Sequence, residues 1–237
     1  MIASRNRHSK RLKFRRLILF VIGLVLVLSS LRLLSNYFRV RNVECYTQYG
    51  LCQEDLYHAV SPLLNRPIFN RGSSAGILNG LRQNLEIKSA VANYKFPQTV
   101  AFEIVLRKPM GQLGSQSSEV YTVSDEEGLV IRLSPRSNLP LLFSDQTYKP
   151  GDRLSDLQLQ ALKIISLVNQ IDAKITEGVM TDHQLTIKSP GPVILLDLDK
   201  IPAQWYPTLQ VLLARSKILS NPPKTIDMRF SNPTISF

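Results

Sequence analysis

Apolar and polar positions divide this chain into one long apolar stretch and a series of shorter periodic patterns. The long stretch, Leu17–Leu34, reads LILFVIGLVLVLSSLRLL and carries no charge between Leu17 and Leu31. A helix of that length rises roughly 27 Å, which approaches the ~30 Å hydrocarbon core of a bilayer. We therefore predict a transmembrane helix over residues 17–36, with Leu17, Leu31 and Leu34 among its apolar side chains.

The flank of this stretch predicts its orientation. Residues 1–16 contain seven Lys or Arg and no acid, and such basic flanks stay in the cytoplasm. The chain after about Asn36 is then expected outside the cytoplasm. A cleaved secretory signal has a shorter apolar core that ends in a small-x-small site, whereas Ser29-Ser30 is followed here by Leu-Arg-Leu-Leu. A buried core helix is disfavoured by the uninterrupted basic flank.

Residues 37–109 carry the pattern strand, helix, helix, strand, strand. Apolar residues alternate with polar ones in the strand segments and recur at helical spacing in the two helices. The second helix has two candidate N-caps, because serine is favoured at that position. The predicted elements are Tyr37–Thr47, Gln53–Asn65, a helix capped by Ser73 or Ser74, Ile87–Lys95 and Thr99–Arg107.

Residues 110–237 are predicted to form a second, mainly antiparallel β domain with flanking helices. Gly111–Ser118 is rich in glycine and serine, which is typical of a loop or domain joint. Gly128 suits the turn of a hairpin, Ser155 and Gln158 form a capping-box pattern, and Pro207 suits the first turn of a helix. The predicted elements are strands 120–123, 129–133, 179–188 and 193–198, and helices from Ser155 to Ile171 and from Pro207.

The chain ends in a predicted strand that begins at Thr225. Ile226, Met228 and Phe230 alternate with Thr225, Asp227 and Arg229, so one face can pack inward while the other stays in water. We expect this last strand to be a sheet edge, with backbone groups free to pair with another strand.

The charge of the chain does not indicate nucleic-acid binding. The net charge is +11, but seven of the basic residues lie before Leu17, and the remaining chain has 22 basic and 18 acidic residues. Attraction to anionic inner-leaflet lipid accounts for the basic tail.

Cys45 and Cys52 are the two cysteines of the chain, and both lie in the part predicted to be outside the cytoplasm. An oxidising exterior permits a disulfide between them, and two partly buried free thiols are the alternative. A metal site with His58 is disfavoured, because the spacing does not match a zinc motif.

No motif specifies catalysis. Gly72–Gly76 fits G-x-S-x-G, but the preceding segment contains Pro67 and is too polar for the buried strand that a nucleophile elbow requires. Ser74 is therefore interpreted as part of an ordinary helix cap. Asp197 and Asp199 are interpreted as residues that solvate a strand end, and His183 as an isolated residue.

The order of these elements, with several short motifs, resembles the FtsQ/DivIB family of bacterial cell-division proteins. The resemblance covers nearly the whole chain and depends on the order and spacing of the motifs. They are Phe38-Arg39-Val40-Arg41-Asn42-Val43, Tyr94-Lys95-Phe96-Pro97, Arg107-Lys108-Pro109, Val120–Val123 with Asp125 and Gly128, Leu139-Pro140, and Ile226-Asp227-Met228-Arg229-Phe230. The Cys45/Cys52 pair departs from the family pattern.

The resemblance implies an α+β protein with a single transmembrane helix, a POTRA domain (β-α-α-β-β) and a β-rich C-terminal domain. It implies a non-enzymatic scaffold at the division septum of the inner membrane, with no cofactor, metal or catalytic residue. Implied partners are FtsB- and FtsL-like coiled-coil proteins and other septal membrane proteins. The implied contact site is the last strand, through Thr225, Asp227, Arg229 and Phe230.

Two other functions fit parts of the sequence. A secretion or envelope-assembly adaptor also carries POTRA domains, although such proteins typically join a β-barrel of many alternating strands. A membrane-anchored cell-wall enzyme would need a catalytic constellation, for which Ser74 is the available nucleophile.

Overall fold

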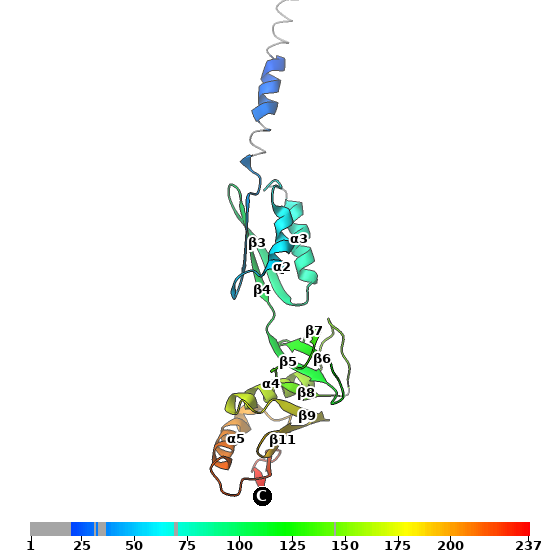
Figure 1. Ribbon diagram of the computed structural model, residues 1–237, viewed down its shortest axis with the longest axis vertical. Helices are drawn as coiled ribbons and strands as arrows, with labels where there is room; N and C mark the ends of the chain where they lie inside the picture. Colours follow the sequence, from blue (N-terminus) through cyan, green and yellow to red (C-terminus); the bar gives the residue numbers. More distant parts are fainter. Residues whose placement is uncertain (1–19, 31, 33–36, 69–70, 145) are drawn as a thin grey trace, which may run out of the picture. The chain divides into compact units, whose positions relative to one another are not determined.

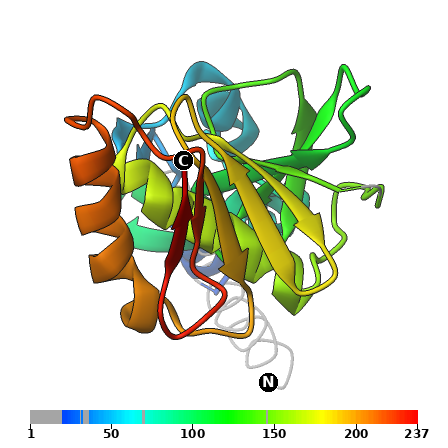
Figure 2. The same ribbon diagram turned by 90° about the horizontal axis from the view of Figure 1, so that it is seen from below.

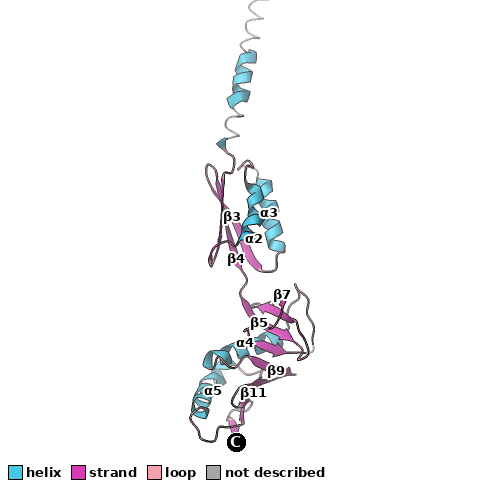
Figure 3. Cartoon of the chain, in the orientation of Figure 1, coloured by secondary structure: helices cyan, strands magenta, loops and turns pink. Residues whose placement is uncertain are grey.

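The computed structural model describes residues 20–30, 32, 37–68, 71–144 and 146–237 (Figure 1). The chain divides into two compact units, Met1–Leu106 and Arg107–Phe237. The division lies close to the predicted domain boundary after Pro109. Each unit has its own mixed sheet with helices (Figure 3), so the predicted α+β class is confirmed.

The predicted membrane span lies partly outside the described residues. Residues 20–30 are helical, whereas Leu17, Leu31 and Leu34 are not among the residues that the structure describes. Within the described part, no helix has the length and apolar character needed to cross a bilayer.

The first unit has the predicted order of elements plus a short additional strand. Its sheet has the order β2-β1-β4-β3, in which β1 is parallel to β4 and β3 is antiparallel to it. The elements are β1 Asn42–Thr47, β2 Gly50–Leu51, α2 Glu54–Val60, a 3-10 turn Ser61–Leu63, α3 Arg71–Gln83, β3 Ile87–Lys95 and β4 Thr99–Leu106.

Helices α2 and α3 lie on one face of this sheet (Figure 1). Phe102 and Ile104 of β4 point into the core with Val60 and Leu81 of the helices, and all four are at most 5% exposed. Glu103 between them is exposed. The predicted alternation along β4 is therefore confirmed.

The second unit is built on a sheet of order β13-β12-β11-β10-β9-β8-β5-β6-β7. Figures 1 and 3 show α4 and α5 on one side of this sheet. The elements are β5 Pro109–Gly114, β6 Tyr121–Asp125, β7 Val130–Ser134, β8 Leu141–Phe143, α4 Asp156–Ile171, β9 Glu177–Thr181, β10 Gln184–Lys188, β11 Val193–Asp197, α5 Pro202–Ser216, β12 Thr225–Asp227 and β13 Thr234–Ser236.

The predicted loop at Gly111–Ser118 is wrong in its first half, because residues 111–114 belong to β5, whereas residues 115–118 contain a turn. A Cβ atom at Gly111 would lie 2.7 Å from Cδ2 of Leu162 in α4, and one at Gly114 would lie 2.6 Å from Cδ1 of Tyr121. These glycines therefore allow close packing of a strand rather than chain flexibility.

Three element boundaries also differ from prediction. The predicted strand 179–188 is two strands, because Asp182 adopts a left-handed conformation (φ 50°) and turns the chain between β9 and β10. Helix α5 begins at Pro202, which leaves Pro207 inside it. Helix α3 begins at Arg71, so Ser73 and Ser74 lie within it and are not its cap. The Ser155–Gln158 capping box and the positive φ of Gly128 are confirmed.

Candidate partner-binding site

The strand predicted to be the open edge of the sheet is in fact paired on both sides. Thr225 and Ile226 of β12 lie in parallel register with Val193 and Ile194 of β11. On its other side β12 pairs antiparallel with β13. The sequence prediction was wrong here because residues 228–233 reverse the chain, so that Thr234–Ser236 pairs back onto β12.

The open edge next to the predicted site is instead β13, Thr234–Ser236. It is the last strand in the sheet order, and all three of its residues are exposed. Figure 2 shows the C-terminal strands, coloured red, beside the rest of the sheet. An edge strand offers unpaired backbone N–H and C=O groups to a strand from another chain.

Arg229 is held against Asp227 rather than extended into solvent. Its Nε donates to Asp227 Oδ1 at 2.9 Å and its Nη2 to Oδ2 at 2.6 Å, while Nη1 reaches Gln184 Oε1 at 3.1 Å. The hydrogen bond from Arg229 holds the pKa of the Asp227 carboxyl below its ordinary value. The guanidinium of Arg229, one of the implied contact residues, is therefore already hydrogen-bonded within the chain.

Phe230 is 59% exposed, whereas Ile226 and Met228 of the same segment are at most 2% exposed. The Arg229 guanidinium lies 5.8 Å from the centre of its ring. An exposed aromatic side chain beside a sheet edge is a favourable anchor for a partner. Phe230 therefore lies outside the core.

A hollow of about 350 Å³ lies beside Phe230. Trp205 lines it, and the indole Nε1 of this buried residue has no hydrogen-bond partner within the part of the chain that the structure describes. Lys200 supplies a positive charge at the same place. The hollow is lined by Lys200, Gln204, Trp205, Met228, Phe230 and Pro233, among others.

Cys45 and Cys52 form a disulfide, with their Cα atoms 5.3 Å apart. Cys45 lies in β1, and Cys52 lies between β2 and α2. The bond resolves the choice between a disulfide and two free thiols that the sequence left open.

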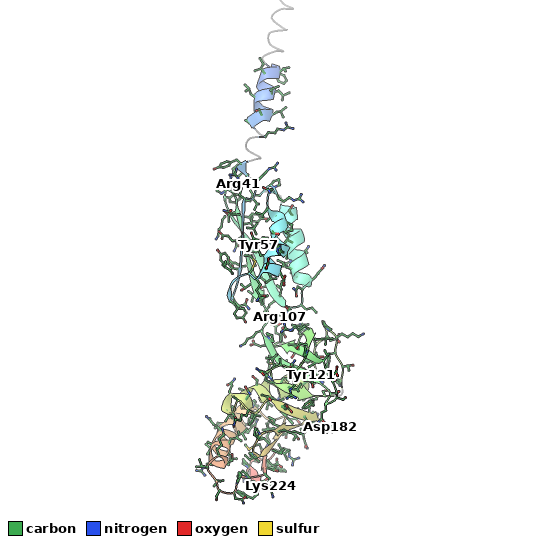
Figure 4. All side chains as sticks on the ribbon, viewed as in Figure 1. Arg41, Tyr57, Arg107, Tyr121, Asp182 and Lys224 are labelled. Atoms are coloured by element: carbon green, nitrogen blue, oxygen red, sulfur yellow. A yellow bond between two sulfur atoms is a disulfide. The ribbon has the colours of Figure 1, made fainter. Side chains whose placement is uncertain are left out.

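Of the residues weighed for catalysis, Ser74 belongs to the first unit, whereas His183, Asp197 and Asp199 lie together in the second unit. Ser74 is buried in α3, and its hydroxyl lies 2.5 Å from the Tyr94 hydroxyl. His183 does have an acidic neighbour, because its Nδ1 lies 3.0 Å from Asp199 Oδ1. This hydrogen bond raises the pKa of His183. The pair lies near Asp182, labelled in Figure 4, with both side chains more than half exposed.

Asp197 organises the turn after β11, since its Oδ1 accepts from the Asp199 backbone N–H at 3.0 Å. Across the described ranges, no group of three His, Cys, Asp or Glu side chains is arranged to hold a metal ion. Comparison with protein-family models and with curated proteins finds no match.

Proposed function

We propose that this chain is a non-enzymatic, membrane-anchored scaffold of the bacterial division machinery, of the FtsQ/DivIB type. In this proposal residues 17–36 span the inner membrane. Both domains that follow, a POTRA domain at residues 37–109 and a β-rich domain at residues 110–237, lie outside the cytoplasm at the septum. The β-α-α-β-β order of the first unit and the sequence motifs support the proposal.

The observation that carries the proposal is the open edge of β13 beside an exposed aromatic side chain. A partner strand can add to β13 through backbone hydrogen bonds. A partner side chain can then cover Phe230 and enter the hollow that Trp205 and Lys200 line. FtsB- and FtsL-like coiled-coil proteins are the partners we propose for this site.

Within this site the described residues have distinct roles. Thr225 and Asp227 belong to β12 and support the edge strand from inside the sheet. Arg229 fixes the segment after β12 by its contacts with Asp227 and Gln184. Of the four predicted contact residues, Phe230 is the exposed one, and its side chain is available to a partner together with the exposed residues of β13.

Capture of a purified FtsB-like protein by the full chain in detergent micelles tests this site. Phe230→Ala should weaken capture about 30-fold, which corresponds to about 2 kcal/mol for an aromatic anchor. Leu133→Ala is a matched control, because Leu133 is an apolar residue, 50% exposed, on β7 at the opposite edge of the same sheet. Equal capture by the parent and the Phe230→Ala variant would contradict the proposal.

A further inference from the structure

Three separate segments of the chain meet at one end of the first unit. The Gln98 carbonyl oxygen accepts from the Arg41 N–H at 2.8 Å, and Gln98 Nε2 donates to the Tyr37 carbonyl oxygen at 2.9 Å. The Arg66 carbonyl oxygen accepts from the Val40 N–H at 2.9 Å. We call this the Tyr37 end, and it comprises residues 37–41, 65–68 and 95–98.

The Tyr37 end lies opposite the end at which the chain leaves the first unit. Figure 4 labels Arg41 at this place. Strand β4 begins here, with Thr99 opposite Lys95 of β3. It ends at Leu106, which lies opposite Ile87. An eight-residue strand is roughly 26 Å long, so the two ends of the unit are well separated.

The Tyr37 end combines basic and aromatic side chains. Its basic residues are Arg39, Arg41, Arg66 and Lys95, and all four are exposed. The nearby acid Glu44 pairs with Lys95, at 2.7 Å, which leaves a positive balance carried by the three arginines. Tyr37 and Phe96 are 57% and 61% exposed. Aromatic rings together with long basic side chains are typical of protein surfaces that lie at a membrane–water interface.

Tyr37 is the first residue after the predicted span, residues 17–36, and it is already tied to the folded unit. Its carbonyl oxygen accepts from Gln98, and the Phe38 carbonyl oxygen accepts from the Ile68 N–H at 2.8 Å. One residue advances a chain by at most about 3.6 Å. If residues 17–36 span the bilayer, the Tyr37 end therefore lies at the level of the lipid headgroups.

We propose that the Tyr37 end binds anionic phospholipid headgroups of the leaflet that faces away from the cytoplasm. Arg39, Arg41 and Arg66 contact the headgroup phosphates, because guanidinium groups donate paired hydrogen bonds to phosphate oxygens. Tyr37 and Phe96 lie at the boundary between headgroups and acyl chains. This inference rests on the span of the proposed function and does not involve the partner site at β13.

Quenching of tryptophan fluorescence by brominated lipid tests the proposal on the full chain, reconstituted in vesicles of phosphatidylcholine and phosphatidylglycerol. Phe96→Trp places a reporter in the Tyr37 end. Tyr49→Trp is the matched control, because Tyr49 is a 72% exposed aromatic residue in the turn between β1 and β2, at the opposite end of the unit. Lipids brominated just below the headgroups should quench the first variant and not the second. The parent, whose single tryptophan is Trp205, supplies the background.

The role of the charges is tested by replacing Arg39, Arg41 and Arg66 together with glutamine in the Phe96→Trp variant. Each basic side chain near an anionic surface strengthens its attraction about fivefold, so quenching should fall in this variant and, in the parent sequence of charges, with rising salt. Arg82→Gln is the control, because Arg82 is exposed in the last turn of α3, near the opposite end. Equal quenching with and without the three arginines would overturn headgroup binding, since the tether alone would then hold this end near the lipid.

Alkaline extraction of the same vesicles tests the span separately. If extraction removes the chain from the vesicles, the span is wrong and the headgroup surface is wrong with it. If the chain stays in the membrane but brominated lipid leaves the Phe96→Trp variant unquenched, the span stands and the headgroup surface alone is wrong.

Discussion

Arg229 and Asp227 form a two-point ion pair in which two nitrogens of the guanidinium each donate to a different carboxylate oxygen, at 2.9 and 2.6 Å. The Asp227 side chain is 12% exposed and that of Arg229 is 30% exposed. The pair joins the end of β12 to the segment that leads into β13. It therefore couples the charge state of one carboxyl group to the geometry of the sheet edge.

This pair predicts a pH dependence of stability. The pKa of Asp227 is lowered in the folded chain, chiefly by the hydrogen bond from Arg229. A lowered pKa contributes stability above the ordinary value of about 3.9, and this contribution is lost as the pH falls through the folded-state pKa. We expect Asp227→Asn to have a lower thermal midpoint than the parent at pH 7. On acidification, the midpoint of the variant should fall by less than that of the parent.

Thermal unfolding of the parent and Asp227→Asn at several pH values checks this expectation. The difference between their midpoints should shrink as the pH falls below about 4. Parallel midpoint curves over the whole range would show that ionisation of the Asp227 carboxyl does not contribute to stability.

Packing along β4 gives a prediction for the first unit. Phe102 is fully buried, whereas Val105 on the same strand is 41% exposed. Phe102→Ala should lower the free energy of unfolding by about 3–5 kcal/mol, and Val105→Ala should change it by less than about 1 kcal/mol. Chemical denaturation followed by circular dichroism measures the free energy of unfolding of both variants. Similar decreases for the two would contradict the inward position of Phe102 and the outward position of Val105 on β4.

Several parts of the fold follow from local sequence patterns. The alternation in β4, the Ser155–Gln158 capping box and the positive φ of Gly128 depend on periodicity or on the chemistry of one turn. Such features are determined by residues close together in the sequence, and sequence analysis predicted them.

The incorrect predictions concern residues with two possible roles. Glycine occurs both in flexible loops and in strands where another side chain packs closely against the backbone. Gly111 and Gly114 are of the second kind, because the side chains of Leu162 and Tyr121 lie where their Cβ atoms would be. Asp182 carried a usable signal, because aspartate tolerates the left-handed conformation in tight turns. The edge position of β13 depends on which strands pair across the sheet, which no local pattern specifies.

The predicted topology is tested by reporters fused after Phe237. Residues 1–16 contain seven basic residues and no acidic one, which favours a cytoplasmic N-terminus. We therefore expect activity from a reporter that folds only outside the cytoplasm. Replacing the seven basic residues with neutral ones should reduce that activity. Activity from a reporter that works only in the cytoplasm would contradict both the orientation and the proposed site of action.

Arg229→Glu is expected to affect folding as well as binding. The substitution places a second carboxylate beside that of Asp227 and removes the two hydrogen bonds that the Asp227 carboxylate accepts from the guanidinium. The two neighbouring carboxylates repel each other when both are ionised, so the thermal midpoint of the variant should be lower than that of the parent at pH 7. Acidification protonates both carboxyl groups, and the midpoint difference from the parent should narrow below about pH 4.

The thermal midpoint of Arg229→Glu decides how a loss of partner capture in this variant is interpreted. If Arg229→Glu lowers both the midpoint and the capture of an FtsB-like protein, whereas Phe230→Ala lowers capture alone, Arg229 acts by positioning the segment before β13. If Arg229→Glu instead leaves the midpoint unchanged at pH 7, the ion pair with Asp227 does not stabilise the unit. A loss of capture would then assign to Arg229 a direct contact with the partner.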